Sequence, residues 1–281
     1  MKSRLPRVET LTSRENRWLS RFRVALRRSP LDDGTVGLEG PHLVEEALRS
    51  RLPIEALLVS QSASGYLDRL ASRVSSSTRL LRTPDRLFAA VSATETPQGI
   101  AALTRPRVAS FDDLVRGLPF VLVLVGIQYP GNVGAILRSA EAFGASGVIT
   151  TAAGSLGTAH PYSPKALRAS AGSALRLPLL PGLSISIALA QLRVAGLRLY
   201  ATSVSEGTPP ASADLRSPSA ILIGNEGAGL PPEVERSCDL LLRIPLASGV
   251  DSLNAAVAAS VLLYESSRQR TAAFAPPTPS S

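Results

Sequence analysis

The fold of this chain is decided by residues 120–145, which read FVLVLVGIQYPGNVGAILRSAEAFGA. The segment opens with an unbroken apolar run, Phe120–Val125, a pattern typical of a parallel strand that is buried on both faces. A polar loop with Gly126 and Gly131 follows, and apolar residues then recur at helical intervals up to Phe143. A strand, a glycine-bearing loop and a helix in this order predict an α/β fold.

The same pattern continues along the C-terminal half of the chain. The apolar runs Ala220–Ile223 and Leu240–Ile244 predict two more buried parallel strands. Apolar periodicity predicts helices over residues 132–143, 163–172, 183–195 and 254–268. Ser163 and Pro164 supply an N-cap and a first-turn proline for the second of these helices. We therefore expect a parallel-sheet domain over residues 118–270.

A smaller α/β domain is predicted ahead of it, over residues 29–105. Its expected strands are Val36–Leu38, Ile54–Ser60 and Gly99–Leu103, and its expected helices are Pro41–Ser50 and Tyr66–Val74. Residues 106–117 are predicted to be a linker, since they follow a Pro-Arg-rich turn and end in glycine. Residues 271–281 are rich in proline, serine and threonine and are predicted to be a disordered tail.

Length and composition narrow the protein class. A chain of 281 residues exceeds the usual ~100–200 residues of one domain, which agrees with two domains. No run approaches the ~18 apolar residues that a membrane span needs, and the N-terminus has no signal-like apolar stretch, so we expect a cytoplasmic protein without a membrane partner. The single cysteine, Cys238, excludes an internal disulfide framework and any cysteine-cluster metal site.

Positive charge is concentrated at the N-terminus. Residues 1–28 carry nine Lys or Arg against two Glu, which accounts for +7 of the net charge of +8. Thr12 and Glu15 have capping-box spacing, so a basic amphipathic helix is predicted over residues 12–28. The arginines expected on its polar side are Arg14, Arg17, Arg21 and Arg28. Such an edge is typical of a polyanion binder, although a merely solvated basic helix has the same composition.

Three predicted strands end in polar loops that contain glycine, where open α/β sheets bind ligands. The first loop precedes Asn132, the second is Gly224–Gly229, and the third is Pro245–Asn254. Repeated glycines indicate a backbone that turns sharply or approaches a ligand closely. Any one of these loops taken alone is also compatible with ordinary loop structure.

Taken together, the three loops resemble the three motifs of the SpoU (TrmH-like) methyltransferases in the SPOUT superfamily. The matching residues are Asn132 with Arg138, then Gly224 with Glu226 and Gly229, then Pro245 with Ser252, Leu253 and Asn254. Residues 165–172, KALRASAG, resemble the segment that the family carries between its first two motifs. Residues 38–47 and 96–100 are similar to a ribosomal-protein-like substrate-binding domain that many members carry.

This resemblance implies an enzyme that transfers a methyl group from S-adenosylmethionine to a ribose 2′-hydroxyl of RNA without a metal. It also implies a deep trefoil knot in the C-terminal domain and catalytic sites formed across a homodimer interface. The residues implied to bind the methyl donor are Leu222, Ile223, Gly224, Asn225, Ile244, Pro245, Leu246, Ser252, Leu253 and Asn254. Lys165 and Arg168, in the segment between the motifs, are expected to bind RNA beside the N-terminal arginines.

The resemblance makes Arg138 the main catalytic candidate. A guanidinium normally stays protonated, so we expect it to stabilise the developing alkoxide and grip a phosphate rather than act as a simple general base. By analogy, Asn132 and Glu226 help to place Arg138 and the nucleotide. Ser252 and Asn254 are expected to organise the third motif and the edge of the donor site.

Other functions fit the sequence less well. The glycine spacing of the second loop is wrong for a dinucleotide fingerprint, which argues against a nucleotide-dependent oxidoreductase. His42 and His160 lie in no nucleophile elbow or metal-ligand pattern, which argues against a hydrolase. A sizeable N-terminal domain favours ribosomal RNA as the target. A transfer-RNA enzyme and a catalytically silent RNA-binding protein of the same fold remain open.

Overall fold

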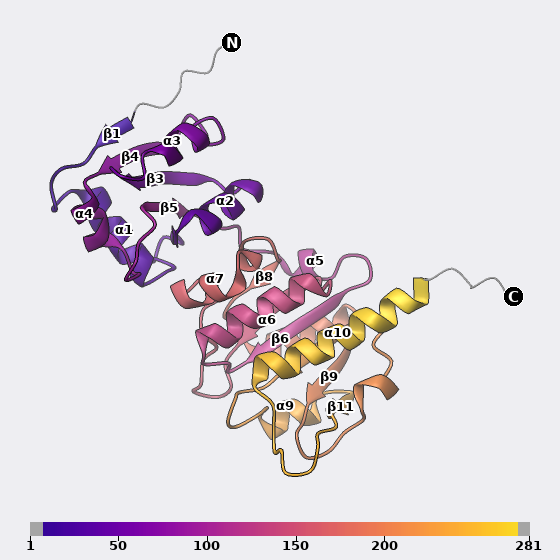
Figure 1. Cartoon of the computed structure of the whole chain (residues 1–281). Coiled ribbons are helices and arrows are strands. Elements are labelled where there is room, and N and C mark those ends of the chain that lie inside the picture. Colours follow the sequence, from indigo (N-terminus) through magenta and orange to yellow (C-terminus); the bar gives the residue numbers. More distant parts are fainter. Residues whose placement is uncertain (1–7, 275–281) are drawn as a thin grey trace, which may run out of the picture. The chain divides into compact units, whose positions relative to one another are not determined.

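A computed structural model of the chain describes residues 8–274. It divides into two compact units (Figure 1). Within the described residues, unit 1 comprises residues 8–107 and 162–176, and unit 2 comprises residues 108–161 and 177–274. In this part of the chain, no helix has both the length and the hydrophobicity that crossing a membrane requires.

Unit 1 contains a five-stranded mixed sheet in the order β1-β4-β3-β5-β2. Its strands are β1 (Val8–Thr10), β2 (Val36–Glu39), β3 (Ile54–Ser60), β4 (Arg79–Thr83) and β5 (Ile100–Thr104). Its helices between residues 8 and 107 are α1 (Arg17–Arg27), α2 (Pro41–Arg49), α3 (Gly65–Leu70) and α4 (Asp85–Val91). The prediction for β3 is confirmed at both ends, whereas the helix predicted over Tyr66–Val74 begins one residue earlier and ends four residues earlier, as α3.

Helix α1 begins later than the sequence predicted. The side chain of Asn16 accepts a hydrogen bond from the Trp18 backbone N–H at 2.8 Å and caps the helix, which then starts at Arg17. The capping box predicted at Thr12 and Glu15 is therefore wrong. The sequence predicted an apolar stripe of Trp18, Leu19, Phe22, Ala25 and Leu26. The last four are buried against α4 and the sheet, and Trp18 is partly buried against the same core.

Residues 162–176 pack with unit 1, although the sequence placed them inside the C-terminal domain of residues 118–270. They form α7 (Pro164–Ser170) and a short 3-10 helix (Ser173–Leu175). The Arg176 guanidinium pairs with the Glu46 carboxylate of α2. Gly172, at φ +91°, lies so close to the Glu46 side chain that an added Cβ would come within 2.8 Å of Glu46 Cγ. The ion pair of Arg176 with Glu46 and the close approach of Gly172 to the same side chain hold this segment against α2 of unit 1.

Unit 2 is built on a six-stranded sheet in the order β11-β9-β10-β6-β7-β8, with every neighbouring pair parallel. Its strands are β6 (Phe120–Val125), β7 (Gly147–Thr151), β8 (Leu179–Leu180), β9 (Arg198–Thr202), β10 (Ser219–Ile223) and β11 (Leu240–Leu242). Strands β6 and β10 are buried throughout, so the α/β fold and the buried parallel strands are confirmed. Strand β11 ends two residues before the predicted Ile244, and the burial predicted for it is wrong, because it lies at the edge of the sheet and only Leu242 is buried.

The helices of unit 2 surround this sheet. They are α5 (Phe111–Leu114), α6 (Pro130–Ala142), α8 (Ile185–Val194), α9 (Pro232–Arg236) and α10 (Ala255–Phe274). Helices α6 and α10 lie side by side (Figure 1), joined by a hydrogen bond of 2.8 Å between the hydroxyls of Ser139 and Ser260. Helix α10 continues through Phe274, four residues into the predicted tail, and residues 275–281 of that tail lie outside the described residues.

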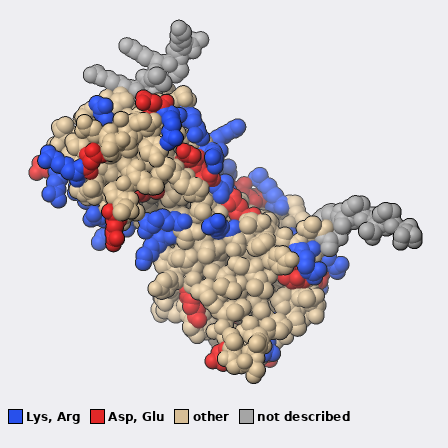
Figure 2. Space-filling view, viewed as in Figure 1, with Lys and Arg blue, Asp and Glu red and all other residues tan. Residues whose placement is uncertain are grey.

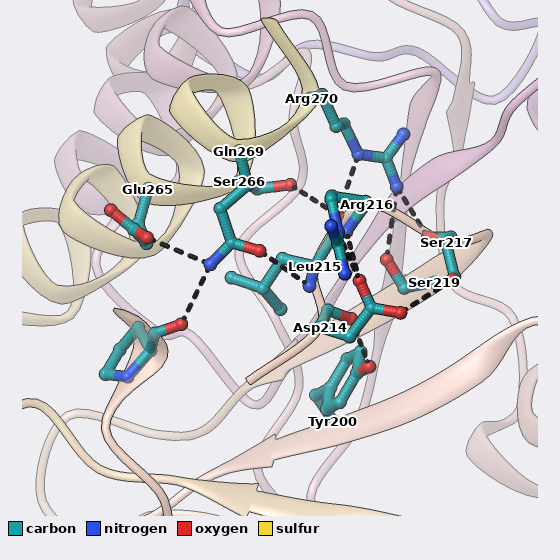
Figure 3. A network of polar contacts seen from close by, with 11 residues as sticks. Tyr200, Asp214, Leu215, Arg216, Ser217, Ser219, Glu265, Ser266, Gln269 and Arg270 are labelled. Atoms are coloured by element: carbon teal, nitrogen blue, oxygen red, sulfur yellow. Dashed lines mark hydrogen bonds and ion pairs between the residues drawn. The ribbon is translucent and has the colours of Figure 1, made fainter. Parts of the chain in front are cut away.

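Arg270 anchors the C-terminal part of α10 to the sheet (Figure 3). Its guanidinium donates to the carbonyl oxygens of Leu215 at 2.9 Å and Ser217 at 2.8 Å, and it lies 4.8 Å from the centroid of the Phe120 ring. Burial lowers the pKa of Arg270 from its ordinary value. These contacts attach α10 to the start of β6 and to the loop before β10, so they fix the helix that begins at the candidate site.

Candidate active site

The strand order predicts a ligand site at the carboxyl ends of β6 and β10. The chain proceeds from β6 through β7 to β8 on one side, and then returns to β10, which pairs with the other side of β6. In doubly wound sheets, ligands bind outside the carboxyl ends of strands at such a reversal. The two loops that meet here are residues 126–129 and 224–229.

Glu226 is the centre of a hydrogen-bond network between these loops. Its carboxylate accepts from the Asn132 side-chain amide at 2.9 Å and from the backbone N–H groups of Gln128 and Tyr129, both at 3.2 Å. Partial burial acts to raise the pKa of Glu226, but the hydrogen bonds from Asn132 and the backbone outweigh it and hold the pKa below its ordinary value. Glu226 is therefore ionised at neutral pH, and its oxygens are occupied by N–H donors.

Asn132 connects this network to the third loop. While its amide nitrogen donates to Glu226, its amide oxygen accepts from the Asn254 side chain at 3.1 Å. Asn254 in turn caps α10, because its side-chain oxygen accepts from the backbone N–H of Ala256 at 2.9 Å. The structure thus brings together three predicted site residues that lie far apart in the sequence.

The second loop is shaped by Asn225 and Gly224. The Asn225 side chain donates to the Gly126 carbonyl at 2.7 Å and accepts from the backbone N–H groups of Gly227 at 3.0 Å and Ala228 at 2.9 Å. At Gly224 an added Cβ would come within 2.4 Å of the Gly229 carbonyl carbon, which is backbone and has no room to shift. The glycine at 224 is therefore required by the close approach of two loop segments.

A pocket of about 610 Å³ opens beside this loop, at the carboxyl ends of β9, β10 and β11. Its volume falls within the ~300–1,000 Å³ range of small-molecule sites. Predicted donor residues that line it are Ile223, Gly224, Asn225, Ile244, Leu246, Ser252 and Leu253. Leu222 is instead buried within β10, and Pro245 and Asn254 adjoin the lining without belonging to it. Glu226 also lines the pocket and so joins it to the polar network.

Other lining residues escaped sequence reasoning. One group is Thr202–Ser205, at the end of β9, and another is Ala247–Asp251, in the third loop. Strand β9 was not predicted, because it begins with Arg198 and its apolar run is only Leu199–Ala201. Had β9 been recognised, the carboxyl-end rule would have pointed to Thr202 and its neighbours.

Arg138 lies apart from the network. It is exposed on α6, six residues after Asn132, which is about 9 Å along the helix axis and about 240° around it. Its guanidinium makes no hydrogen bond or ion pair with any residue that the structure describes. The polar network and the pocket are therefore assembled within one chain, whereas the main catalytic candidate faces solvent.

The predicted RNA-binding residues all lie in unit 1, where Lys and Arg are frequent on the face drawn in Figure 2. Lys165 and Arg168 are exposed on α7. We use the name basic edge for three of the predicted arginines, which are exposed near α1: Arg14, Arg17 and Arg28. Arg21 differs, since its guanidinium pairs with Asp33 at 2.8 Å and Glu55 at 2.9 Å.

No group of three or more His, Cys, Asp or Glu side chains suited to a metal ion occurs among residues 8–274. The single cysteine lies half-buried, and its pKa is raised to about 12, mainly by burial.

Comparisons with known proteins agree with this geometry. Residues 119–264, just over half of the chain, match the profile of the SpoU rRNA Methylase family, and residues 25–102 match that of the MRM3-like substrate binding domain. The 23S rRNA (guanosine(2553)-2'-O)-methyltransferase RlmP of Bacillus subtilis is 32% identical over 227 residues, which are 81% of this chain and 86% of that protein.

Solved structures are similar over nearly the whole chain. The AdoMet-bound rRNA methyltransferase from Sinorhizobium meliloti has a TM-score of 0.83 at 28% identity and covers 93% of this chain and 98% of its own. The SpoU methyltransferase AviRb from Streptomyces viridochromogenes, in complex with AdoMet, has a TM-score of 0.82 at 29% identity over 92% and 99% of the two chains. With its motifs joined in one network and both of its regions matched, this chain belongs to the SpoU rRNA methylase family.

Proposed function

We propose that this protein methylates a ribose 2′-hydroxyl of ribosomal RNA, with S-adenosylmethionine as the methyl donor. The observation that carries the proposal is the link between the pocket and the polar network, since Glu226 both lines the pocket and holds Asn132. The similarity to RlmP, whose name specifies a 2'-O-methyltransferase of 23S rRNA, supports the target.

The pocket fits the donor in size and in chemistry. Ile223, Leu246 and Leu253 supply apolar surface for a flat base. The backbone at Gly229 and Gly249, where an added Cβ would meet nothing within 4 Å, lies open to close approach. When bound, S-adenosylmethionine supplies an electrophilic methyl group on a sulfonium. The residues of the chain hold that group and the RNA in line, which requires no metal.

We assign Arg138 to the RNA side of the reaction. Its exposed guanidinium stabilises negative charge that develops on the attacking 2′-oxygen and grips a neighbouring phosphate. Asn132, Glu226 and Asn254 act as positioning residues, because their polar atoms are engaged with one another and with the backbone. Ser252 contributes to the wall of the donor pocket.

A homodimer would complete the site. Helix α10 exposes an apolar stripe at i, i+4 and i+7, formed by Val257, Val261 and Tyr264, with 49%, 39% and 56% exposure. Because α10 packs against α6, which carries Arg138, a second copy seated on this stripe would bring its own Arg138 towards the network. We also infer a trefoil knot, supported by the third loop, which shares the pocket wall with the second loop before entering α10.

Unit 1 is proposed to bind the RNA through phosphates. The basic edge, Lys165 and Arg168 are exposed and belong to one compact unit, and residues 25–102 match a substrate binding domain. Arg21 is left out of this set, because its charge is neutralised by two carboxylates. A ribosomal RNA substrate would place the protein in the cytoplasm.

Transfer of tritium from labelled S-adenosylmethionine to RNA tests the proposal. Ribosomal RNA transcripts are expected to accept label at a 2′-O-methylated nucleotide, and transfer-RNA transcripts are not. Calorimetry with S-adenosylhomocysteine, on the same preparation, reports on the donor pocket. Donor binding without methylation of either RNA would favour the silent RNA-binding alternative. Methylation of transfer RNA alone would identify transfer RNA as the substrate.

A further inference from the structure

Tyr129 is an exposed aromatic residue on a fixed backbone. Its N–H donates to Glu226 at 3.2 Å, and its carbonyl accepts from the Val133 N–H at 3.1 Å in the first turn of α6. Pro130 follows it and restricts its backbone to the extended region, at φ −84° and ψ 112°. The Tyr129 residue is nevertheless 69% exposed. The main chain is therefore held on both sides while the ring faces solvent.

The position of this ring distinguishes it from other exposed apolar residues, which are common on protein surfaces. Glu226 lines the 610 Å³ pocket and accepts the Tyr129 N–H, so Tyr129 lies one hydrogen bond from the pocket wall. Its neighbour Gln128 is also exposed, and the Gln128 N–H donates to the same carboxylate. Tyr129 is thus an exposed aromatic residue whose backbone is held by Glu226, a residue of the pocket wall.

We propose that Tyr129 is a stacking platform for an unpaired nucleobase of the RNA substrate. The inference rests on the proposed function and adds to it, since it states how the substrate is gripped. Aromatic rings bind bases that are splayed out of loops and bulges, because an unpaired base offers its flat face. A ring on a fixed backbone loses little conformational freedom when a base stacks on it, which favours binding.

The expected effect is on RNA and not on the donor. Loss of one stacked base costs about 1–3 kcal/mol, so Tyr129→Ala should weaken RNA binding by about 5-fold to 150-fold. Tyr129→Phe keeps the ring and should stay near wild type, whereas Tyr129→Leu keeps apolar area without the ring and should resemble the alanine variant. The affinity for S-adenosylhomocysteine should be unchanged in all three. Val194→Ala, at a 90% exposed position on α8, is the matched control.

A fluorescence experiment tests stacking directly. The only tryptophan is Trp18, so Trp18→Phe combined with Tyr129→Trp leaves one indole, at residue 129. Its emission should be quenched by a short single-stranded oligoadenylate and by the methylated ribosomal transcript, and it should be quenched much less by a fully paired duplex. Quenching that is equal for the duplex and the single strand would contradict stacking on an unpaired base.

The outcomes separate this inference from the proposed function. If wild-type protein transfers methyl groups and Tyr129→Ala does so with unchanged KM and RNA affinity, only the inference is overturned. If Tyr129→Ala changes the dimer dissociation constant in sedimentation and leaves RNA affinity intact, the ring belongs to a protein interface. That result would also overturn the inference. If wild-type protein binds the donor but no RNA is methylated, the proposed function itself fails.

Discussion

Asn132 offers a direct test of the polar network, because an aspartate at this position is almost the same shape but has no N–H. In Asn132→Asp the second carboxylate would face Glu226 across the 2.9 Å that now separates donor and acceptor. Asn132→Ala is the uncharged control, and both variants are compared in an Asn254→Ala background. Aspartate would keep an oxygen that can accept from Asn254, so with Asn254 intact the two variants would differ in that hydrogen bond as well. In the Asn254→Ala background both variants lose only the hydrogen bond to Glu226, and their difference isolates the repulsion.

The magnitude follows from the distance. Two unit charges about 2.9 Å apart repel by about 1.4 kcal/mol in water and by about 5.7 kcal/mol at an effective dielectric constant of 20. Glu226 is exposed, so screening favours the lower part of this range, about 1.5–3 kcal/mol. For a domain the size of unit 2, that difference corresponds to about 3–12 °C in Tm. At about pH 8, Asn132→Asp should therefore unfold at a lower temperature than Asn132→Ala.

The lowered pKa of Glu226 determines the direction in which stability changes with pH. In the wild type the pKa of Glu226 is lowered, so its contribution to stability is present above its ordinary pKa of 4.5 and is lost as the pH falls through the folded value. In Asn132→Asp the facing carboxylates raise the pKa of the pair, and a shared proton relieves the repulsion as the pH falls. The difference in Tm between the two variants should become smaller as the pH falls from about 8 to about 5. Thermal unfolding followed by circular dichroism measures it, and a gap that is absent or independent of pH would refute the role given to Asn132.

Four further outcomes are expected. Arg138→Ala should lower methyl transfer by about 100-fold or more while leaving donor affinity unchanged in calorimetry, and near-wild-type turnover would remove it from the chemistry. Gly224→Ala should cost about 1–3 kcal/mol in thermal unfolding and abolish donor binding, since its Cβ would meet backbone at 2.4 Å; unchanged donor affinity would contradict this account of the loop. Glutamine at the three positions of the basic edge should make the slope of log affinity against log salt shallower by up to ~0.9 per lost phosphate contact on a duplex, whereas Arg21→Gln should lower stability and leave the slope unchanged. Since burial raises the pKa of Cys238 to about 12, labelling by a disulfide reagent at about pH 8 should be slow until the protein is unfolded, and rapid labelling of folded protein would contradict its burial.

The sequence by itself determined the fold class and the motif residues. Phe120–Val125 and Ile54–Ser60 form strands over the predicted bounds, because a strand buried on both faces needs little beyond an apolar run. The motif residues were found through the resemblance of the three loops, taken together, to the SpoU family, since each loop taken alone is compatible with ordinary loop structure. Local patterns of this kind are set by the backbone and by burial of adjacent residues.

Only the tertiary structure decided which of these residues act together. Asn132 meets Glu226 and Asn254 across separations of 94 and 122 residues, and the order of strands in the sheet creates that meeting. The same holds for Arg21, whose partner Glu55 lies 34 residues away and removes it from the expected phosphate-binding edge. Sequence periodicity shows on which side of a helix a side chain lies. Its partner depends on segments that folding alone brings within hydrogen-bond distance.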